Sequence, residues 1–262
     1  MSKTENEHRQ EIVEIGGRLH QKGFVAATDG NISVRLDGGR VLITPSNVSK
    51  GMCRPEDLIV VDRDGNKISG ERNASSELAM HLMIYDLRPD IHGIVHAHPP
   101  TATGYAAAGL PLNKALISEV VVSLGFVPLA RYGTPGTPEL SDALRDLIPH
   151  YDAILMANHG VVTYGEYLLK AYFHMETVEH FARISLVTEL LGKQVLLARQ
   201  DVEKLLEART KYYGAPSGTT PAGEEPVVAD AHSSSKHFSL MQEEFKKLLE
   251  EAIRKLKVWP TS

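Results

Sequence analysis

Two histidines separated by one residue are the part of this sequence best suited to chemistry. His96 and His98 end the apolar stretch 94–98, which has the composition of a buried strand. Because side chains alternate between the two faces of a strand, both imidazoles are expected on the same face, near enough to bind one metal ion. His159 ends a second apolar run, 153–159, and three strand-borne imidazoles would leave one open position on a tetrahedral Zn2+. An open position distinguishes a catalytic metal from a structural one.

His159 also allows a second interpretation, as a hydrogen-bonded residue in a tight turn before Gly160. The residues alone leave both roles open. Glu77 has two possible roles as well. It is either a favourable charge in the first turn of a helix, or a general base that removes a proton from the carbon beside a carbonyl while a metal stabilises the enediolate.

Three short segments offer backbone amides and hydroxyls that can bind an anion. Ser75 and Ser76 precede a predicted helix, where exposed N–H groups favour negative charge. The segments 30–33 and 44–47 have turn composition, and consecutive N–H groups in turns can surround a phosphate. Each signal is weak when taken singly.

The elements that must position these residues follow from periodicity and turn signals. Predicted helices cover residues 11–22, 75–87, 101–108, 138–148 and 167–191, and predicted strands cover 30–35, 40–44, 58–62, 94–98, 127–130 and 153–160. Strands alternate with helices, so the expected fold is α/β, with helices covering a mixed or antiparallel sheet.

Composition excludes several classes of protein. The 262 residues carry a formal net charge of -5 and no run of basic residues, which argues against binding of nucleic acid or of a membrane surface, although small anions remain allowed. The single cysteine, Cys53, forms no intrachain disulfide and is interpreted as a small half-buried residue rather than a nucleophile. Residues 1–10 are polar and lack the apolar core of a secretory signal, and no run of 18 apolar residues occurs. We therefore expect a cytoplasmic protein.

The chain is expected to divide into a catalytic domain, 1–214, a Pro/Gly/Ser-rich linker, 215–235, and a C-terminal amphipathic helix, 236–262. The apolar seam of that helix must pack on something. Docking on its own or a neighbouring subunit is favoured over binding of a foreign partner.

In their order along the chain, the motifs resemble those of the class II aldolase/adducin family, which includes fuculose-1-phosphate aldolase and ribulose-5-phosphate 4-epimerase. The resemblance covers most of the first 215 residues, and its motifs are Gly30-Asn31-Ile32-Ser33-Val34-Arg35, Ile43-Thr44-Pro45-Ser46, Ser75-Ser76-Glu77, His96-Ala97-His98-Pro99 and Asn158-His159-Gly160. It implies a three-layer α/β/α fold with a central, mainly antiparallel sheet, and a homotetramer with active sites at subunit interfaces. It also implies one divalent metal per subunit, Zn2+ with Mn2+ or Co2+ as alternatives.

The resemblance also implies roles for single residues. Glu77 is the acid/base, which can also contact the metal before substrate binds, and the metal ligands are His96, His98 and His159. The positions that hold the substrate phosphate are Asn31, Ser46, Asn47, Ser75 and Ser76.

Two positions of this sequence depart from the family pattern or fit it in more than one way. Asn47 stands where the sugar-phosphate enzymes usually have Gly, which puts the backbone approach to a phosphate in question. Tyr213 matches a C-terminal Tyr-Gly that orients the aldehyde oxygen from a neighbouring subunit, but a packing role beside Tyr212 is an equal alternative.

The expected activity is that of a metal-dependent lyase that reversibly cleaves a small phosphorylated ketose by a retro-aldol reaction, through an enediolate. Alternatives are a sugar-phosphate 4-epimerase, for which no acid/base pair is recognised, and a decarboxylase of a hydroxylated keto or aromatic acid, which the Asn47 substitution keeps open. A non-enzymatic scaffold like adducin is disfavoured, because a scaffold gains little from three histidines and Glu77.

Overall fold

The structure is a computed structural model that describes residues 3–213 and 227–229. Its centre is one eight-stranded sheet with the order β4-β3-β2-β1-β5-β8-β7-β6, in which every neighbouring pair is antiparallel except β6 and β7. The strands are β1 (Asn31–Arg35), β2 (Val41–Ile43), β3 (Ile59–Val61), β4 (Lys67–Ser69), β5 (Gly93–Ala97), β6 (Leu129–Ala130), β7 (Ala153–Met156) and β8 (Gly160–Gly165).

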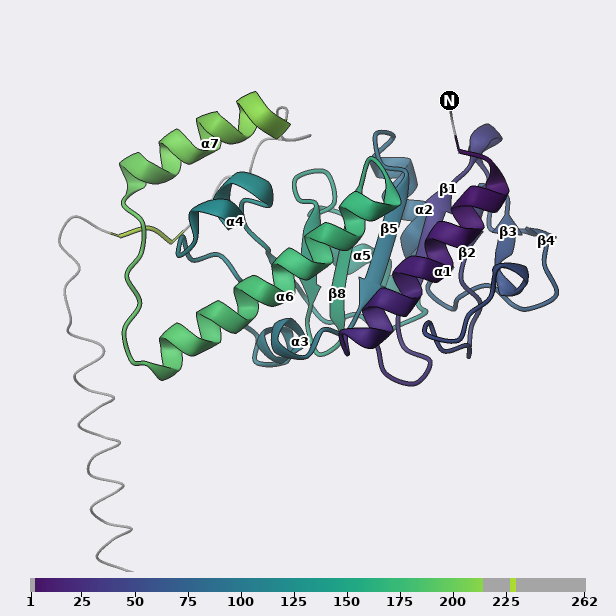
Figure 1. Ribbon diagram of the computed structural model, residues 1–262, viewed down its shortest axis with the longest axis horizontal. Coiled ribbons are helices and arrows are strands. Elements are labelled where there is room, and N and C mark those ends of the chain that lie inside the picture. The colour runs from purple at the N-terminus through teal and green to yellow at the C-terminus, as the bar shows by residue number, and fades with distance from the viewer. Residues whose placement is uncertain (1–2, 214–226, 230–262) are drawn as a thin grey trace, which may run out of the picture.

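Helices cover both faces of this sheet (Figure 1). They are α1 (Glu5–Gln21), α2 (Leu78–Leu87), α3 (Pro100–Ala107), α4 (Ser118–Ser123), α5 (Pro138–Leu144), α6 (Leu168–Leu190) and α7 (Arg199–Tyr213), with short 3-10 helices at Asp37–Gly39 and Pro55–Asp57. One apolar cluster joins α1, α3 and α6 to one face, and a second joins α2 and α5 to the other. The predicted three-layer α/β/α fold with a mainly antiparallel sheet is confirmed.

Strand alternation decides which side chains reach each layer. On β1, Ile32 and Val34 enter the layer of α1 and α6, so Asn31 and Ser33 face the layer of α2. On β5, Ile94 packs in the α2 layer. His96 has the same parity as Ile94 and is paired with Asn31 in the neighbouring strand. The α2 layer therefore receives the polar groups of both central strands.

Most predicted elements are found, but the start of α1 differs and four elements were not predicted, namely α4, α7, β4 and β8. Helix α1 begins at Glu5 rather than near residue 11, because Thr4 and Glu7 form a capping box in which the Thr4 N–H donates to Glu7 Oε2 at 2.7 Å. Strand β8 was not predicted as a separate strand, although it pairs with both β5 and β7 and is buried throughout. Helix α7 was missed too. Its Val202 packs against the Val121 region of α4.

Beyond α7 only residues 227–229 are described. Val227 bridges to Lys114 and Ala229 to Ala198, so this piece of the predicted linker lies on the surface of the domain. The remainder of the predicted linker 215–235 and the whole predicted helix 236–262 lie outside the described residues. The domain boundaries at 214 and 235 therefore stay predictions. No helix in the described ranges is long and apolar enough to cross a membrane.

Candidate metal centre and active site

Three imidazole rings converge where β5 ends. The ring centroids of His96 and His98 are 4.9 Å apart, those of His96 and His159 are 4.8 Å apart, and those of His98 and His159 are 5.1 Å apart. One ring nitrogen of each residue lies within 4.8 Å of those of the other two. The convergence that the sequence predicted is therefore present.

The expectation that all three rings are carried by strands is wrong. Only His96 lies inside a strand, since β5 ends at Ala97 and His98 is the next residue. His159 lies in the turn that joins β7 to β8, as its second interpretation proposed. The chain reverses there because Asn158 adopts a φ of 55°, a left-handed conformation that asparagine tolerates better than most residues. The tight turn and the cluster are thus compatible.

Gly160 allows this turn to approach His98 closely. A Cβ at this position would lie 2.5 Å from His98 Cδ2 and 2.7 Å from the Ala97 carbonyl oxygen. Neither distance is possible for a real side chain. The glycine of the Asn158-His159-Gly160 motif is therefore required by packing between the two parts of the cluster.

Hydrogen bonding fixes the protonation of the His96 ring. Its Nδ1 lies 2.9 Å from the Val161 carbonyl oxygen, which only accepts, so Nδ1 carries the hydrogen and Nε2 presents a lone pair. That lone pair faces His98 Nε2 at 3.1 Å. Burial lowers the pKa of His96 to about 3, which keeps the ring neutral. Three imidazole nitrogens that lie this close to one another fit a divalent cation such as Zn2+.

Glu77 completes the cluster from the side of α2. Its Oε2 lies 3.2 Å from His96 Nε2, and its Oε1 lies 3.3 Å from His159 Nε2. Oε1 is buried and has no hydrogen-bond partner among the described residues. Burial alone raises the pKa of Glu77, but His96, His159 and a hydrogen bond from Asn31 outweigh that effect and lower it. An ionised carboxylate beside three imidazoles can bind a cation or accept a proton.

The predicted phosphate-binding loops are held together by backbone contacts. The Ser46 N–H donates to the Asn73 carbonyl at 3.0 Å, the Ser46 hydroxyl donates to the Ala74 carbonyl at 2.8 Å, and the Ser75 N–H donates to the Thr44 carbonyl at 3.2 Å. Ser75 is buried and its hydroxyl accepts from the Glu77 N–H, whereas Ser76 is exposed. The structure thus brings the two loops side by side and next to Glu77.

Asn47 adopts a φ of 58° and is exposed. This is the left-handed conformation in which glycine is most common, so asparagine substitutes here without a change of backbone. The substitution leaves the loop geometry intact and adds an amide side chain to the loop.

Asn31, another predicted phosphate ligand, is buried and its side chain is already engaged. Its Nδ2 donates to Glu77 Oε2 at 2.7 Å, and its Oδ1 lies 2.5 Å from His81 Nε2. The amide nitrogen carries two hydrogens, so one can bind Glu77 while the other binds a substrate oxygen. For Tyr213 only the position at the end of α7 is described, and its side chain lies outside the described part.

Two residues that the sequence did not predict support His98 and the helix that follows it. Asp29 Oδ2 lies 3.5 Å from His98 Nδ1. Glu179, which is 1% exposed, accepts from the backbone N–H groups of Thr101 and Ala102 at 3.1 and 2.9 Å and so caps the helix that follows His98. An acidic residue on the apolar side of a long helix was the available signal for Glu179.

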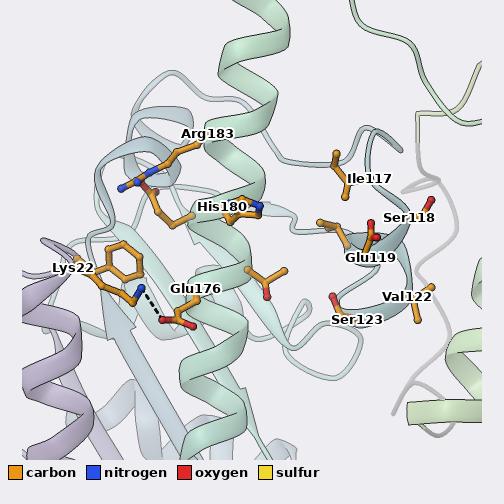
Figure 2. Close-up of a pocket in the computed structure, with 13 residues that line it drawn as sticks. Lys22, Ile117, Ser118, Glu119, Val122, Ser123, Glu176, His180 and Arg183 are labelled. Carbon is orange, nitrogen blue, oxygen red and sulfur yellow. Dashed lines mark hydrogen bonds and ion pairs between the residues drawn. The ribbon is translucent and has the colours of Figure 1, made fainter.

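A cavity of about 770 Å3 lies between the end of α1, α4 and α6 (Figure 2). Two ion pairs lie in its lining, since Lys22 contacts Glu176 at 3.1 Å and Arg183 contacts Glu179 at 2.8 Å. None of the three clustered histidines lines it. The chemistry is therefore assigned to the histidine cluster and not to this cavity.

The matching family model is the Class II Aldolase and Adducin N-terminal domain, which covers residues 10–186. The chain belongs to the class II aldolase and adducin family. It is 36% identical over 199 residues to a 5-deoxy-D-ribulose 1-phosphate aldolase of Bacillus thuringiensis serovar kurstaki, with 75% of this chain and 92% of that protein covered. It is 32% identical to a 3-oxo-tetronate 4-phosphate decarboxylase of Haemophilus influenzae, with 79% and 100% covered.

Among solved structures, an L-fuculose 1-phosphate aldolase superposes on this class II aldolase-family chain with a TM-score of 0.73 and 33% identity, covering 79% of this chain and 97% of that one. The predicted reaction class is confirmed. The chain is an enzyme of the class II aldolase type, a carbon–carbon lyase. Class II aldolases depend on a metal, and the histidine cluster can hold one.

Proposed function

We propose that this enzyme cleaves a small phosphorylated ketose by a reversible retro-aldol reaction at the centre formed by Glu77, His96, His98 and His159. The observation that carries the proposal is the approach of the Glu77 carboxylate to within 3.3 Å of two imidazole nitrogens, next to the two loops that backbone hydrogen bonds hold side by side. The proposal includes Zn2+ as the metal, with Mn2+ or Co2+ as alternatives, one per subunit.

The residues divide the work. His96, His98 and His159 would hold the cation, which when bound polarises the substrate carbonyl and stabilises the negative charge that develops as the carbon–carbon bond breaks. Ser46, Ser75, Ser76 and the amide of Asn47 orient the phosphate end of the substrate. Glu77 returns a proton to the donor carbon in the direction of cleavage and removes it in the direction of condensation.

The proposal also includes a homotetramer with active sites between subunits, with Tyr213 reaching the site of a neighbouring subunit, and a cytoplasmic location. The family resemblance supports the tetramer. The single cysteine supports a reducing compartment, since no intrachain disulfide forms.

The test uses metal-loaded protein and a panel of ketose 1-phosphates, and follows release of dihydroxyacetone phosphate and an aldehyde. Wild-type protein is expected to release both, and to exchange deuterium into the donor carbon. Glu77→Gln is expected to keep stoichiometric metal and lose about 100- to 10,000-fold in exchange rate, the range of general acid–base catalysis.

Glu166→Gln is the matched control, because it makes the same chemical change on an exposed carboxylate that forms an ion pair with Lys170 at 3.5 Å. It is expected to behave like wild-type. Full exchange activity in Glu77→Gln would remove the proposed base, and a wild-type protein that cleaves no ketose phosphate would remove the proposed substrate class.

Asn47 supports a second candidate, decarboxylation of a phosphorylated 3-oxo acid. Loss of CO2 leaves the same type of electron-rich intermediate beside a carbonyl, and several relatives named as 3-oxo-tetronate 4-phosphate decarboxylases match this chain at 32–35% identity. Release of CO2 without an aldehyde fragment would favour this candidate. Asn47→Gly keeps the backbone conformation, so a change in the product ratio would report on the added amide alone.

A further inference from the structure

Four buried side chains form an unbranched hydrogen-bonded chain that ends on Glu77. The Tyr85 hydroxyl lies 2.9 Å from Ser33 Oγ, Ser33 Oγ lies 2.6 Å from His81 Nδ1, and His81 Nε2 lies 2.5 Å from Asn31 Oδ1. The Asn31 amide then donates to Glu77 Oε2 at 2.7 Å. Ser33 and His81 are fully buried, and Asn31 and Tyr85 are 4% and 5% exposed. We call these four residues the buried polar chain.

Two simple sequence patterns create this chain. Asn31 and Ser33 are two apart on β1 and so share a face of the sheet. Glu77, His81 and Tyr85 follow one another at intervals of four residues and so form one stripe from the start of α2 along its length. Packing of α2 on that face of β1 brings the two patterns together, inside an otherwise apolar layer.

The positions of the hydrogens follow from the Glu77 end. An ionised carboxylate only accepts, so the Asn31 nitrogen must face it and the Asn31 oxygen must face His81. His81 Nε2 therefore carries the hydrogen and Nδ1 accepts from the Ser33 hydroxyl. Ser33 then accepts from the hydroxyl of Tyr85. Every donor points towards Glu77, and no buried group of the chain is left unpaired.

We propose that the buried polar chain is a positioning device, in which Tyr85, Ser33 and His81 hold the Asn31 amide so that it fixes the orientation of the Glu77 carboxylate. The inference rests on the proposed role of Glu77 as the proton-transferring base. The chain does not conduct protons, because an amide nitrogen has no lone pair available to accept one. It is not a hydrolytic triad either, since Ser33 is inaccessible and already engaged with Tyr85.

The first test needs no substrate. In protein labelled with 15N at histidine, the long-range 15N–1H spectrum distinguishes the two neutral tautomers and the doubly protonated ring, and comparison with His81→Gln identifies the His81 signals. The expected result is a neutral ring with its hydrogen on Nε2. A hydrogen on Nδ1, or a doubly protonated ring, would reverse the donor order and overturn the inference.

The second test separates positioning from simple packing. His81→Phe keeps an aromatic ring but removes both nitrogens. It is expected to lower kcat about 10- to 100-fold, as loss of a hydrogen-bonding partner behind a reacting group commonly does, while KM changes less than about threefold. His81→Gln is expected to restore most of kcat, because its amide offers one donor and one acceptor. An unchanged kcat in His81→Phe, or no recovery in His81→Gln, would contradict the proposal.

His174→Phe is the control, because His174 is a second buried histidine, whose Nδ1 donates to the Tyr164 carbonyl at 3.0 Å, and it has no hydrogen bond or ion pair with Glu77 among the described residues. It is expected to lose stability and keep kcat. If His81→Phe fails to fold, Ser33→Ala takes its place. It is expected to lower kcat several-fold and to weaken the preference of His81 for the Nε2 tautomer. A wild-type kcat together with a wild-type tautomer preference would overturn the inference.

Different results would overturn the proposed function and the positioning role of the buried polar chain. A wild-type enzyme without activity on any ketose phosphate would end the proposed function and leave the tautomer measurement to decide the chain's geometry. Normal proton exchange in Glu77→Gln would end the positioning role together with the proposed base.

Discussion

Substitution of Gly160 by alanine tests whether the close approach between the β7–β8 turn and His98 organises the metal centre. The added Cβ would start 2.5 Å from His98 Cδ2 and 2.7 Å from the Ala97 carbonyl oxygen, whereas ordinary contacts begin at 3.4 Å. One side of the centre must therefore move by about 0.7–0.9 Å. Because the Ala97 oxygen belongs to the backbone of β5, part of that movement falls on the ligand-bearing segment.

Such a displacement has two consequences of known size. Overpacking of a well-packed interior costs about 1–3 kcal/mol of unfolding free energy. Misplacement of a reacting group by about 1 Å can reduce activity about 100-fold. We therefore expect Gly160→Ala to fold, to bind Zn2+ more weakly in competition with a chromogenic chelator, and to lose activity about 100-fold.

Gly104→Ala is the matched control, since Gly104 lies in α3 and a Cβ there meets nothing within 4 Å. Alanine in place of a helical glycine is expected to raise stability by up to about 1 kcal/mol without affecting metal binding. Wild-type metal affinity and turnover in Gly160→Ala would refute the reasoning, because the turn would then tolerate a side chain without moving the ligand.

Four further outcomes are expected. The unfolding free energy of chelator-treated protein should be about 2.7 kcal/mol lower than that of protein at a free metal concentration 100 times the Kd. A Tm that does not change with metal concentration would contradict metal binding to the native state. Burial raises the pKa of the Cys53 thiol to about 11, so iodoacetamide at pH 8 should modify native protein far more slowly than urea-unfolded protein; equal rates would show the thiol to be accessible. Glu179→Gln should lower the unfolding free energy measured in urea by about 1–3 kcal/mol, because an amide replaces the acceptor of the α3 N–H groups, while Glu166→Gln should change it little. Burial lowers the pKa of His81 to about 4, so between pH 6.5 and pH 4 only the unfolded state takes up a proton at this residue. The unfolding free energy of metal-free protein should therefore decrease as the pH is lowered from 6.5 to 4, and it should decrease less steeply in His81→Gln.

The sequence was most informative where a local pattern carries its own geometry. Alternation along the segment 93–97 places His96 on the face that receives α2, and this follows from the pleat of any strand. The three-four periodicity of residues 167–191 predicted α6 to within one residue at each end. The order of the motifs gave the family, and the family gave the fold.

Boundaries that depend on single contacts were harder to predict. The start of α1 depends on the reciprocal bonds between Thr4 and Glu7, which lie outside its apolar periodicity. Strand β8 and the turn before it depend on a left-handed Asn158 and on a glycine that fits against His98. These features are visible as residue types, but their consequence requires a neighbour from another part of the chain.

What the sequence determined by itself is the chemistry available: three imidazoles, a carboxylate, and loops rich in amide and hydroxyl donors. What only the tertiary structure decided is which of these groups meet. The pattern of Asn31 and Ser33 and the pattern of Glu77, His81 and Tyr85 are each legible along the chain, yet nothing local pairs them. Their pairing depends on the packing of α2 against β1, because a hydrogen bond between residues about 50 positions apart forms only when the apolar layer around it brings the two elements into contact.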